Sequence, residues 1–147
     1  MSSLSRYSFM ATARSFKNIV PVKRLFPLRG EGWVNYRQNS CALELPPEIG
    51  SFYRSLLPKY IGVNTPKYSA HITIVREWER PNKEFLNRPY DGYYFPFTYS
   101  GKIYSDGTYF FLKCDSKMVR QMRNEFGLTH YRKDGCYHIT IANCKGR

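Results

Sequence analysis

Two of the three histidines lie in a repeated tetrapeptide whose residue types suit acid–base chemistry. The sequence His-Ile-Thr-Ile occurs at residues 71–74 and again at residues 138–141. Side chains alternate between the two faces of a β-strand, so each copy would present an imidazole beside a hydroxyl, with two isoleucines on the reverse face. An imidazole can donate or accept a proton near neutral pH. The pattern therefore indicates general acid–base catalysis on a phosphate, whose oxygens the threonine hydroxyls would bind.

No other motif in the sequence competes as a catalytic set. There is no glycine-rich phosphate loop, no G-x-S-x-G sequence and no cluster of carboxylates for metal-assisted cleavage. Cys136 and His138 would share one strand face, but zinc normally takes three or four protein ligands, and no further histidine or acidic cluster is nearby. The four cysteines form no C-x-x-C pair, and we expect reduced thiols in a cytoplasmic protein. We predict no metal and no cofactor.

The charge and aromatic content of the chain indicate a polyanionic partner. Its 23 Lys and Arg residues against 11 Asp and Glu residues give a formal net charge of +12. Such a field attracts nucleotides, nucleic acid or acidic membrane surfaces, although a charge that merely maintains solubility is the alternative. The 13 Tyr and 10 Phe residues offer faces on which bases can stack, which favours nucleotides. No apolar run reaches the length of a membrane span, and we predict neither membrane association nor an obligate protein partner.

The chain is expected to form one domain, residues 1–147, built from two closely packed lobes. Residues 1–30 contain no acidic residue before Glu31 and are interpreted as a basic N-terminal arm or first strand, with an organellar transit peptide as the alternative. Strands are predicted at 33–36, 41–45, 70–75, 95–104, 108–114 and 136–143, and helices at 46–57 and between Ser116 and Gly127. The order of these elements predicts two similar halves, each pairing an amphipathic helix with one motif strand.

Several short signals define where the predicted elements begin and end. Asp106-Gly107 is typical of a tight hairpin turn. Ser116 is a predicted N-cap and Gly127 a predicted C-cap of the second helix. The sequence Arg29-Gly30-Glu31-Gly32 is interpreted as a break that separates the basic arm from the first strand.

With its two motifs, the chain resembles the two-histidine, or 2H, phosphoesterase superfamily, whose mark is a pair of H-Φ-[ST]-Φ motifs in which Φ is apolar. Both tetrapeptides, which begin 67 residues apart, satisfy this pattern in full. The resemblance covers the chain in outline from Trp33 to the end. It implies an α+β, bilobal fold in which two antiparallel sheets face each other across a central cleft, with helices on the outside and one motif on each lobe. It also implies metal-free catalysis by His71, Thr73, His138 and Thr140.

The superfamily includes phage nucleases that destroy the cyclic-oligonucleotide signals of CBASS immunity, and the short, tyrosine-rich chain resembles that branch in general character. We therefore expect an enzyme, a metal-independent phosphodiesterase that cleaves cyclic di- or trinucleotides in the host cytoplasm. The alternatives are an RNA 2′,3′-cyclic phosphodiesterase or 2′-5′ oligonucleotide phosphodiesterase, and a non-catalytic RNA-binding protein of the same fold. The presence of both histidines and both threonines favours an enzyme, because a binding protein has no chemical need for all four.

Four further residues are predicted to bind the substrate. Tyr36 and Trp78 flank the first motif, where their rings would stack on bases, and ordinary core packing is the alternative interpretation. Arg76 and Lys145 would offset the negative charge of the phosphate.

Overall fold

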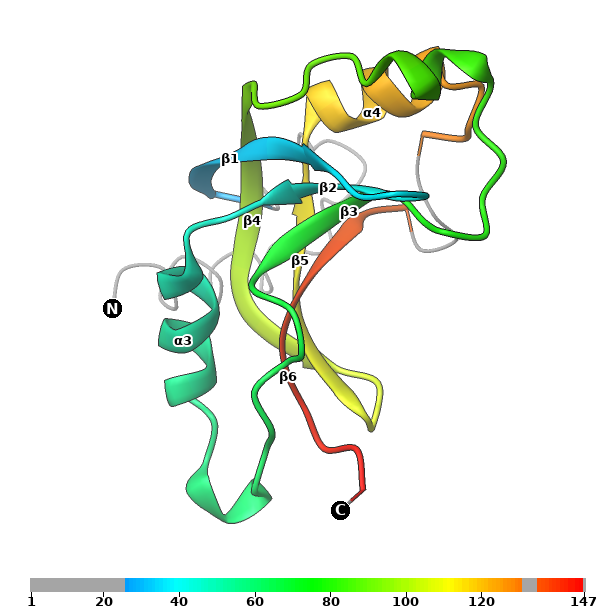
Figure 1. Ribbon diagram of the computed structural model, residues 1–147. Coiled ribbons are helices and arrows are strands. Elements are labelled where there is room, and N and C mark those ends of the chain that lie inside the picture. The colour runs from blue at the N-terminus through cyan, green and yellow to red at the C-terminus, as the bar shows by residue number, and fades with distance from the viewer. Residues whose placement is uncertain (1–25, 131–134, 147) are drawn as a thin grey trace.

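The computed structural model describes residues 26–130 and 135–146 (Figure 1). Within these ranges the strands are β1 (Leu28–Tyr36), β2 (Cys41–Glu44), β3 (His71–Val75), β4 (Tyr94–Ser105), β5 (Tyr109–Asp115) and β6 (Tyr137–Asn143). The helices are α3 (Pro47–Ser55), α4 (Lys117–Glu125) and the short 3-10 helices η2 (Lys59–Ile61) and η3 (Lys83–Asn87). None of these described helices combines the length and the apolarity that crossing a membrane requires. Most of the predicted basic arm lies outside the described residues, and its last three residues belong to β1.

In the described part of the chain, the strands form one closed antiparallel barrel in the order β1-β2-β3-β6-β5-β4. The predicted bilobal α+β fold, with two sheets facing each other across a central cleft, is therefore wrong. Two three-stranded sheets are present in outline, but they join at both edges, through β3 with β6 and through β1 with β4. An open sheet edge carries unpaired N–H and C=O groups, and edge-to-edge pairing satisfies them.

The two halves of the chain repeat the element order strand, strand, helix, strand. The first half consists of β1, β2, α3 and β3, and the second consists of β4, β5, α4 and β6. The predicted succession of one helix and one motif strand is present along the chain in each half, but each helix contacts the motif strand of the other half: α3 contacts β6 and α4 contacts β3. The halves meet at the motif strands, where Ile72 is opposite Ile139 in register. Because these residues hold the same place in the two motifs, an approximate twofold axis passes between β3 and β6.

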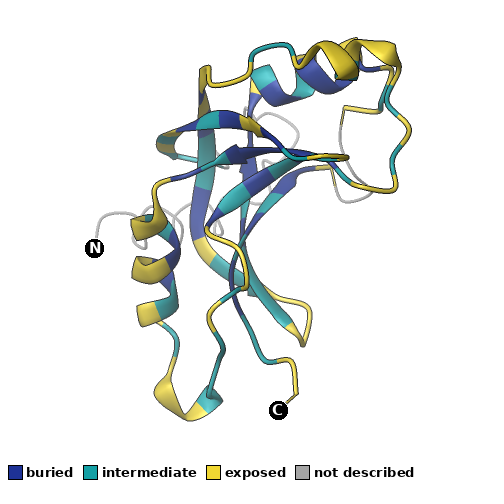
Figure 2. Ribbon diagram, in the orientation of Figure 1, coloured by how far each residue is buried: buried dark blue, intermediate teal, exposed yellow. Residues whose placement is uncertain are grey.

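One hydrophobic core joins the strands to both helices. Its largest fully buried side chains are Tyr137, Phe126, Leu43, Leu45, Ile72, Ile74, Leu112, Met122, Ile139, Ile141, Val34 and Val75. Helix α4 contacts β3 and β4, which are not neighbours in the barrel, and α3 contacts β6. Figure 2 shows both helices turning their buried faces toward the strands and their outer turns toward solvent. Since both motif isoleucines of β3 and β6 belong to this core, the motif histidines and threonines point to the opposite face.

Strand β1 begins five residues earlier than predicted because its two glycines lie inside the strand. A Cβ atom on Gly32 would lie 2.4 Å from the carbonyl oxygen of Glu44, and one on Gly30 would lie 2.6 Å from the Phe97 ring. Only glycine fits at such close approaches, so the predicted break at residues 29–32 is instead the part of β1 that packs most tightly.

The predicted caps and the predicted hairpin turn are confirmed. The Ser116 hydroxyl accepts a hydrogen bond from the backbone N–H of Val119 at the start of α4. Gly127, just after α4, has a φ of 76°, and Gly107 in the hairpin has a φ of 99°, values that favour glycine. In the same turn, hydrogen bonds from the backbone N–H groups of Tyr109 and Thr108 lower the pKa of Asp106.

Candidate active site

The four motif side chains lie together on one face of β3 and β6. The central isoleucines of the two motifs are opposite each other in register. One step to either side in an antiparallel pair, His71 is therefore opposite Thr140 and Thr73 is opposite His138. All four residues are half-buried, whereas the isoleucines behind them are fully buried. We call these four residues the motif quartet. Pairing of adjacent strands brings them together, and not the predicted approach of two lobes across a cleft.

The two histidines occupy diagonal corners of the motif quartet. Diagonal neighbours in an antiparallel pair lie about 7–8 Å apart. Each imidazole extends beyond its Cβ atom, so a single phosphate placed between the rings can contact both. The threonine hydroxyls at the other two corners can then approach the remaining phosphate oxygens. The arrangement places two imidazoles, which can exchange protons, and two hydroxyls on one face of the adjacent strands.

His71 is held by a backbone hydrogen bond at one ring nitrogen. Its Nδ1 atom lies 2.7 Å from the carbonyl oxygen of Ser69. A carbonyl oxygen can only accept, so Nδ1 carries a proton and donates it in this bond. In the neutral ring the lone pair then resides on Nε2, which is the form of a proton acceptor. Glu44 of β2 is opposite His71 in register, and its carboxylate accepts a hydrogen bond from Arg37 at 3.1 Å.

His138 is held by ring stacking on the neighbouring strand β5. Its ring centroid lies 4.3 Å from that of Phe111, with an angle of 28° between the ring planes. Phe111 is opposite Thr140 in register, and Lys113 is opposite His138. The stacking limits the orientations of the imidazole, and the lysine adds a positive charge beside it.

A pocket of about 560 Å³ opens beside the edge of the motif quartet formed by His71 and Thr140. We call it the tyrosine pocket. Its other lining residues combine two tyrosines and two lysines with amide and hydroxyl groups: Asn64, Thr65, Pro66, Lys67, Tyr68, Tyr109, Asn143 and Lys145. Small-molecule sites typically measure about 300–1,000 Å³, so one nucleotide is of suitable size for this pocket.

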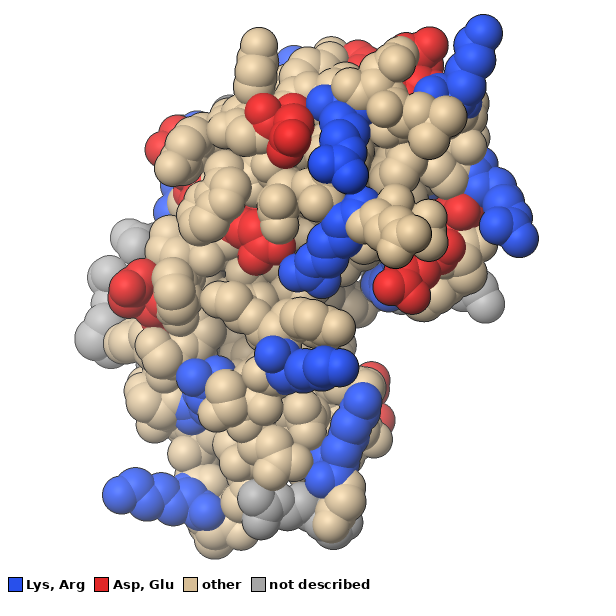
Figure 3. Space-filling model, in the orientation of Figure 1, with Lys and Arg blue, Asp and Glu red and all other residues tan. Residues whose placement is uncertain are grey.

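Cationic groups lie against both tyrosine rings of the tyrosine pocket. The Lys145 Nζ atom is 5.1 Å from the centroid of the Tyr109 ring. The Lys67 Nζ atom and the Arg37 guanidinium carbon are 5.4 Å and 4.7 Å from the centroid of the Tyr68 ring. Rings offer stacking faces to a base, while cations attract its phosphate. On the face seen in Figure 3, the charged side chains of the lower half are mainly Lys and Arg.

The loop that forms one wall of the tyrosine pocket is tied to the end of β6 by Asn64. The backbone N–H of Asn64 donates to the Asn143 carbonyl at 2.6 Å, and the backbone N–H of Asn143 donates back at 3.2 Å. The side-chain amide of Asn64 donates to Asn143 Oδ1 at 3.2 Å and to the Lys145 carbonyl at 3.1 Å. These bonds position Lys145 and the loop around His71.

The residues predicted to bind substrate are distributed over three places. Lys145 lines the tyrosine pocket. Tyr36 is buried in the core, where its hydroxyl donates to the Pro89 carbonyl at 2.7 Å. Burial also raises the pKa of Tyr36 well above its usual range. Its ring is therefore not on the surface that carries the motif quartet.

Arg76 and Trp78 follow the end of β3 that is farther from His71. At about 3.3 Å per residue, the extended strand places Arg76 roughly 16 Å from His71. The Arg76 guanidinium lies 5.3 Å from the centroid of the Trp78 ring, which is 70% exposed. Neither residue lines the tyrosine pocket.

Several aromatic and basic residues that surround the quartet were not predicted from the sequence. Tyr109, Phe111 and Lys113 alternate along β5, and the register places them opposite Asn143, Thr140 and His138 of β6. A period-two pattern of aromatic and basic residues was therefore present in the predicted strand. Tyr68 lies in the loop before β3, where no periodicity marks it.

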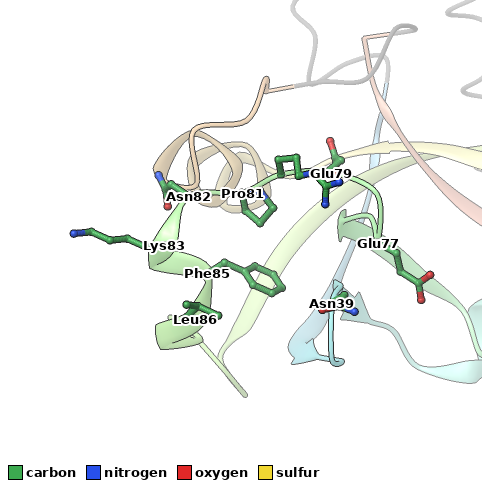
Figure 4. Close-up of a pocket in the computed structure, with 9 residues that line it drawn as sticks. Asn39, Glu77, Glu79, Pro81, Asn82, Lys83, Phe85 and Leu86 are labelled. Carbon is green, nitrogen blue, oxygen red and sulfur yellow. The ribbon is translucent and has the colours of Figure 1, made fainter.

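A second cavity, of about 420 Å³, lies between η3 and the segment after β3 (Figure 4). Its lining includes Glu77 and Glu79 but no histidine. The Glu79 carboxylate already accepts two hydrogen bonds from the buried Arg123, at 2.8 and 2.9 Å, and so serves the packing of α4. Within residues 26–130 and 135–146, no three His, Cys, Asp or Glu side chains are grouped to hold a metal ion, and all four cysteines are free thiols.

No family model, no curated protein and no solved structure matches the chain. The function of the protein must therefore be inferred from the motif quartet and the tyrosine pocket.

Proposed function

We propose that the protein is a 2H-type phosphodiesterase that cleaves ribonucleotide phosphodiesters in the cytoplasm, with cyclic di- or trinucleotides as the leading substrates. The observation that carries this proposal is the position of both His-x-Thr motifs on adjacent strands, with all four functional side chains on one face. A tyrosine- and lysine-lined pocket of nucleotide size beside His71 supports the same substrate class.

In the proposed reaction, His71 acts as the base and His138 as the acid. His71 Nε2 takes the proton from the ribose 2′-hydroxyl, whose oxygen forms a bond to the adjacent phosphorus. The bond from phosphorus to the leaving 5′-oxygen breaks, and that oxygen takes a proton from the His138 imidazolium. The products are a 2′,3′-cyclic phosphate and a 5′-hydroxyl. Proton exchange with water returns both rings to their starting forms, and no step of this sequence requires a metal ion.

The other two corners of the quartet and the nearby lysines stabilise the charge that develops on phosphorus. Thr73 and Thr140 donate hydrogen bonds to the non-bridging oxygens, where negative charge increases in the transition state. Lys113, opposite His138, and Lys145, in the tyrosine pocket, supply positive charge. A non-catalytic RNA-binding protein would need the lysines and the aromatic rings, but not an imidazole fixed as a proton acceptor by Ser69.

Turnover by single-histidine variants tests the proposal directly. His71→Ala and His138→Ala should each lower kcat/KM by about 10²- to 10⁴-fold, the usual contribution of a positioned acid or base. The assay panel contains cyclic dinucleotides, cyclic trinucleotides, 2′-5′ oligoadenylate and 2′,3′-cyclic mononucleotides, each with and without excess EDTA. Activity is expected to persist in EDTA.

The third histidine provides a matched control for this experiment. His130 is exposed, and its backbone carbonyl, not its ring, accepts a hydrogen bond from Tyr137. His130→Ala should therefore retain wild-type activity. Full activity in either motif variant would overturn the proposal, and loss of activity in EDTA that zinc or manganese restores would indicate a metal-dependent nuclease.

A further inference from the structure

Aromatic rings extend the motif quartet across two further strands of the barrel. The His138 ring stacks on Phe111 of β5 with 4.3 Å between centroids. Phe111 in turn stacks on Tyr104 of β4, with 6.1 Å between centroids and 20° between the ring planes. Tyr104 and Phe111 are opposite each other in register. We call these three rings the aromatic ladder; the reaction proposed above uses only the first of them.

Two lysines lie over the outer ring of the aromatic ladder. The Nζ atoms of Lys113 and Lys102 are 4.4 Å and 5.2 Å from the centroid of the Tyr104 ring. Lys102 is exposed, and the three rings and Lys113 are half-buried. The hydrophobic core does not include Tyr104 or Phe111, whereas their strand neighbour Leu112 is fully buried within it. The ladder therefore lies on the face opposite the core, which is the face of the quartet.

Stacked rings with lysines above them match the chemistry of single-stranded nucleic acid. A base can stack on a ring whatever its identity, and a lysine can pair with the phosphate that follows it. The tyrosine pocket begins at His71, whereas the aromatic ladder begins at His138. A phosphate bound between the two histidines thus has the tyrosine pocket on its His71 side and the aromatic ladder on its His138 side.

We propose that the aromatic ladder binds the nucleotide on one side of the scissile phosphate while the tyrosine pocket binds the nucleotide on the other side. The substrate is then an oligonucleotide, linear or cyclic, and not a 2′,3′-cyclic mononucleotide. This inference rests on the proposed function, because the two catalytic histidines define where the scissile phosphate lies. It restricts the substrate to molecules with at least two linked nucleotides, and it depends on the aromatic ladder, which is not part of the two motifs.

Binding of a probe that cannot be cleaved tests the ladder separately from catalysis. The probe is a dinucleotide of two deoxythymidines joined by a 3′-5′ phosphodiester, which lacks the attacking 2′-hydroxyl; thymidine 3′-monophosphate is its one-nucleotide counterpart. By calorimetric titration, Tyr104→Ala should weaken dinucleotide binding roughly 5- to 150-fold, the range that loss of one base–aromatic stack produces. Binding of the mononucleotide should not change, and Tyr104→Phe, which keeps the ring, should restore dinucleotide binding.

A tyrosine outside both surfaces provides the control. Tyr60 is 90% exposed in η2, and Tyr60→Ala should bind both probes as the wild type does. Unchanged dinucleotide binding in Tyr104→Ala, or equal weakening of both probes, would overturn the ladder assignment. If the wild type cleaves no ribonucleotide yet its dinucleotide binding depends on Tyr104, the proposed catalysis fails and the ladder is supported as a nucleotide-binding surface.

Discussion

Thr73 and Thr140 occupy the corners of the motif quartet beside the two histidines, and in the proposed reaction their hydroxyls bind the non-bridging phosphate oxygens. Valine has nearly the same shape but cannot donate a hydrogen bond. Thr140→Val is expected to lower kcat by about 10²- to 10³-fold, as loss of one transition-state donor does in other enzymes, with little change in KM. Steady-state kinetics measure both constants. Thr98→Val, on β4, is the control and should leave kcat unchanged; an equal loss there would indicate a general effect on packing.

At this scale the sequence indicated which four side chains share one face of β3 and β6, and it indicated little of what surrounds them. His71 and His138 were recognisable because their neighbours repeat, and alternation in a strand dictates that Thr73 and Thr140 share their faces. Tyr36 was misleading because its place before the first motif says nothing about its face, and it shares a strand face with the core residue Val34 two positions earlier. Phe111 becomes part of the site only through the register of β5 with β6, which no local pattern specifies.

At the scale of elements, α4 is fixed to the segment after β3 by one buried guanidinium. Arg123 is 3% exposed and donates to the carbonyl oxygens of Ile74 and Thr129 at 2.6 and 2.7 Å. Its other bonds go to both carboxylate oxygens of Glu79. Removal of the carboxylate leaves a buried charge without its counter-ion, which is more costly than loss of an exposed pair.

Glu79→Ala is therefore expected to lower the free energy of unfolding by about 3 kcal/mol. Urea denaturation measures this loss as a lower midpoint with an unchanged slope. The pair of Arg37 and Glu44 is the comparison, because the Arg37 side chain is 38% exposed, and Arg37→Ala should cost less than about 1 kcal/mol. Equal losses in the two variants would mean that the burial of Arg123 does not determine the effect.

Most elements were predictable because their signals are local. The helices carry proline or serine at their starts, and the hairpin carries Asp-Gly, so each was located within about two residues. Strand β1 was shortened in the prediction because Gly30 and Gly32 resemble a turn in the sequence. Their function is to let β1 approach Phe97 and the backbone of β2, and this contact is visible only in the folded structure.

At the scale of the whole molecule, the net charge of +12 predicts salt-dependent binding of nucleic acid. For a single strand, each phosphate that the protein neutralises contributes about −0.7 to the slope of log K against log salt. Lys102→Gln and Lys145→Gln should each make the slope shallower by about 0.7 when a deoxythymidine oligonucleotide is titrated at several salt concentrations. Lys83→Gln, on η3, should leave the slope unchanged (Figure 4). An equal change in all three variants would indicate a diffuse charge effect instead of phosphate binding in the site.

The closed barrel could not be predicted from the sequence because it depends on two long-range strand pairings, β1 with β4 and β3 with β6. The repeat of helix and motif strand indicated two halves, and the resemblance to the 2H phosphoesterases implied two separate sheets. The composition of β3 and β6 does not indicate whether these two strands face each other across a cleft or pair side by side in one sheet. The pairing of Ile72 with Ile139 decides between these topologies.

That pairing also determines when, during folding, the two motif histidines come together. The residues that join β3 to β6 are 67 positions apart in the sequence, and β1 joins β4 over a similar distance. Contacts of large sequence separation form late, since the entropy of closing the intervening chain must be lost first. During synthesis, a growing chain that ends before β6 holds one histidine of the pair and an open edge on β3. In the proposed reaction both histidines are needed, so catalysis would require the completed barrel, in which β6 brings His138 beside β3.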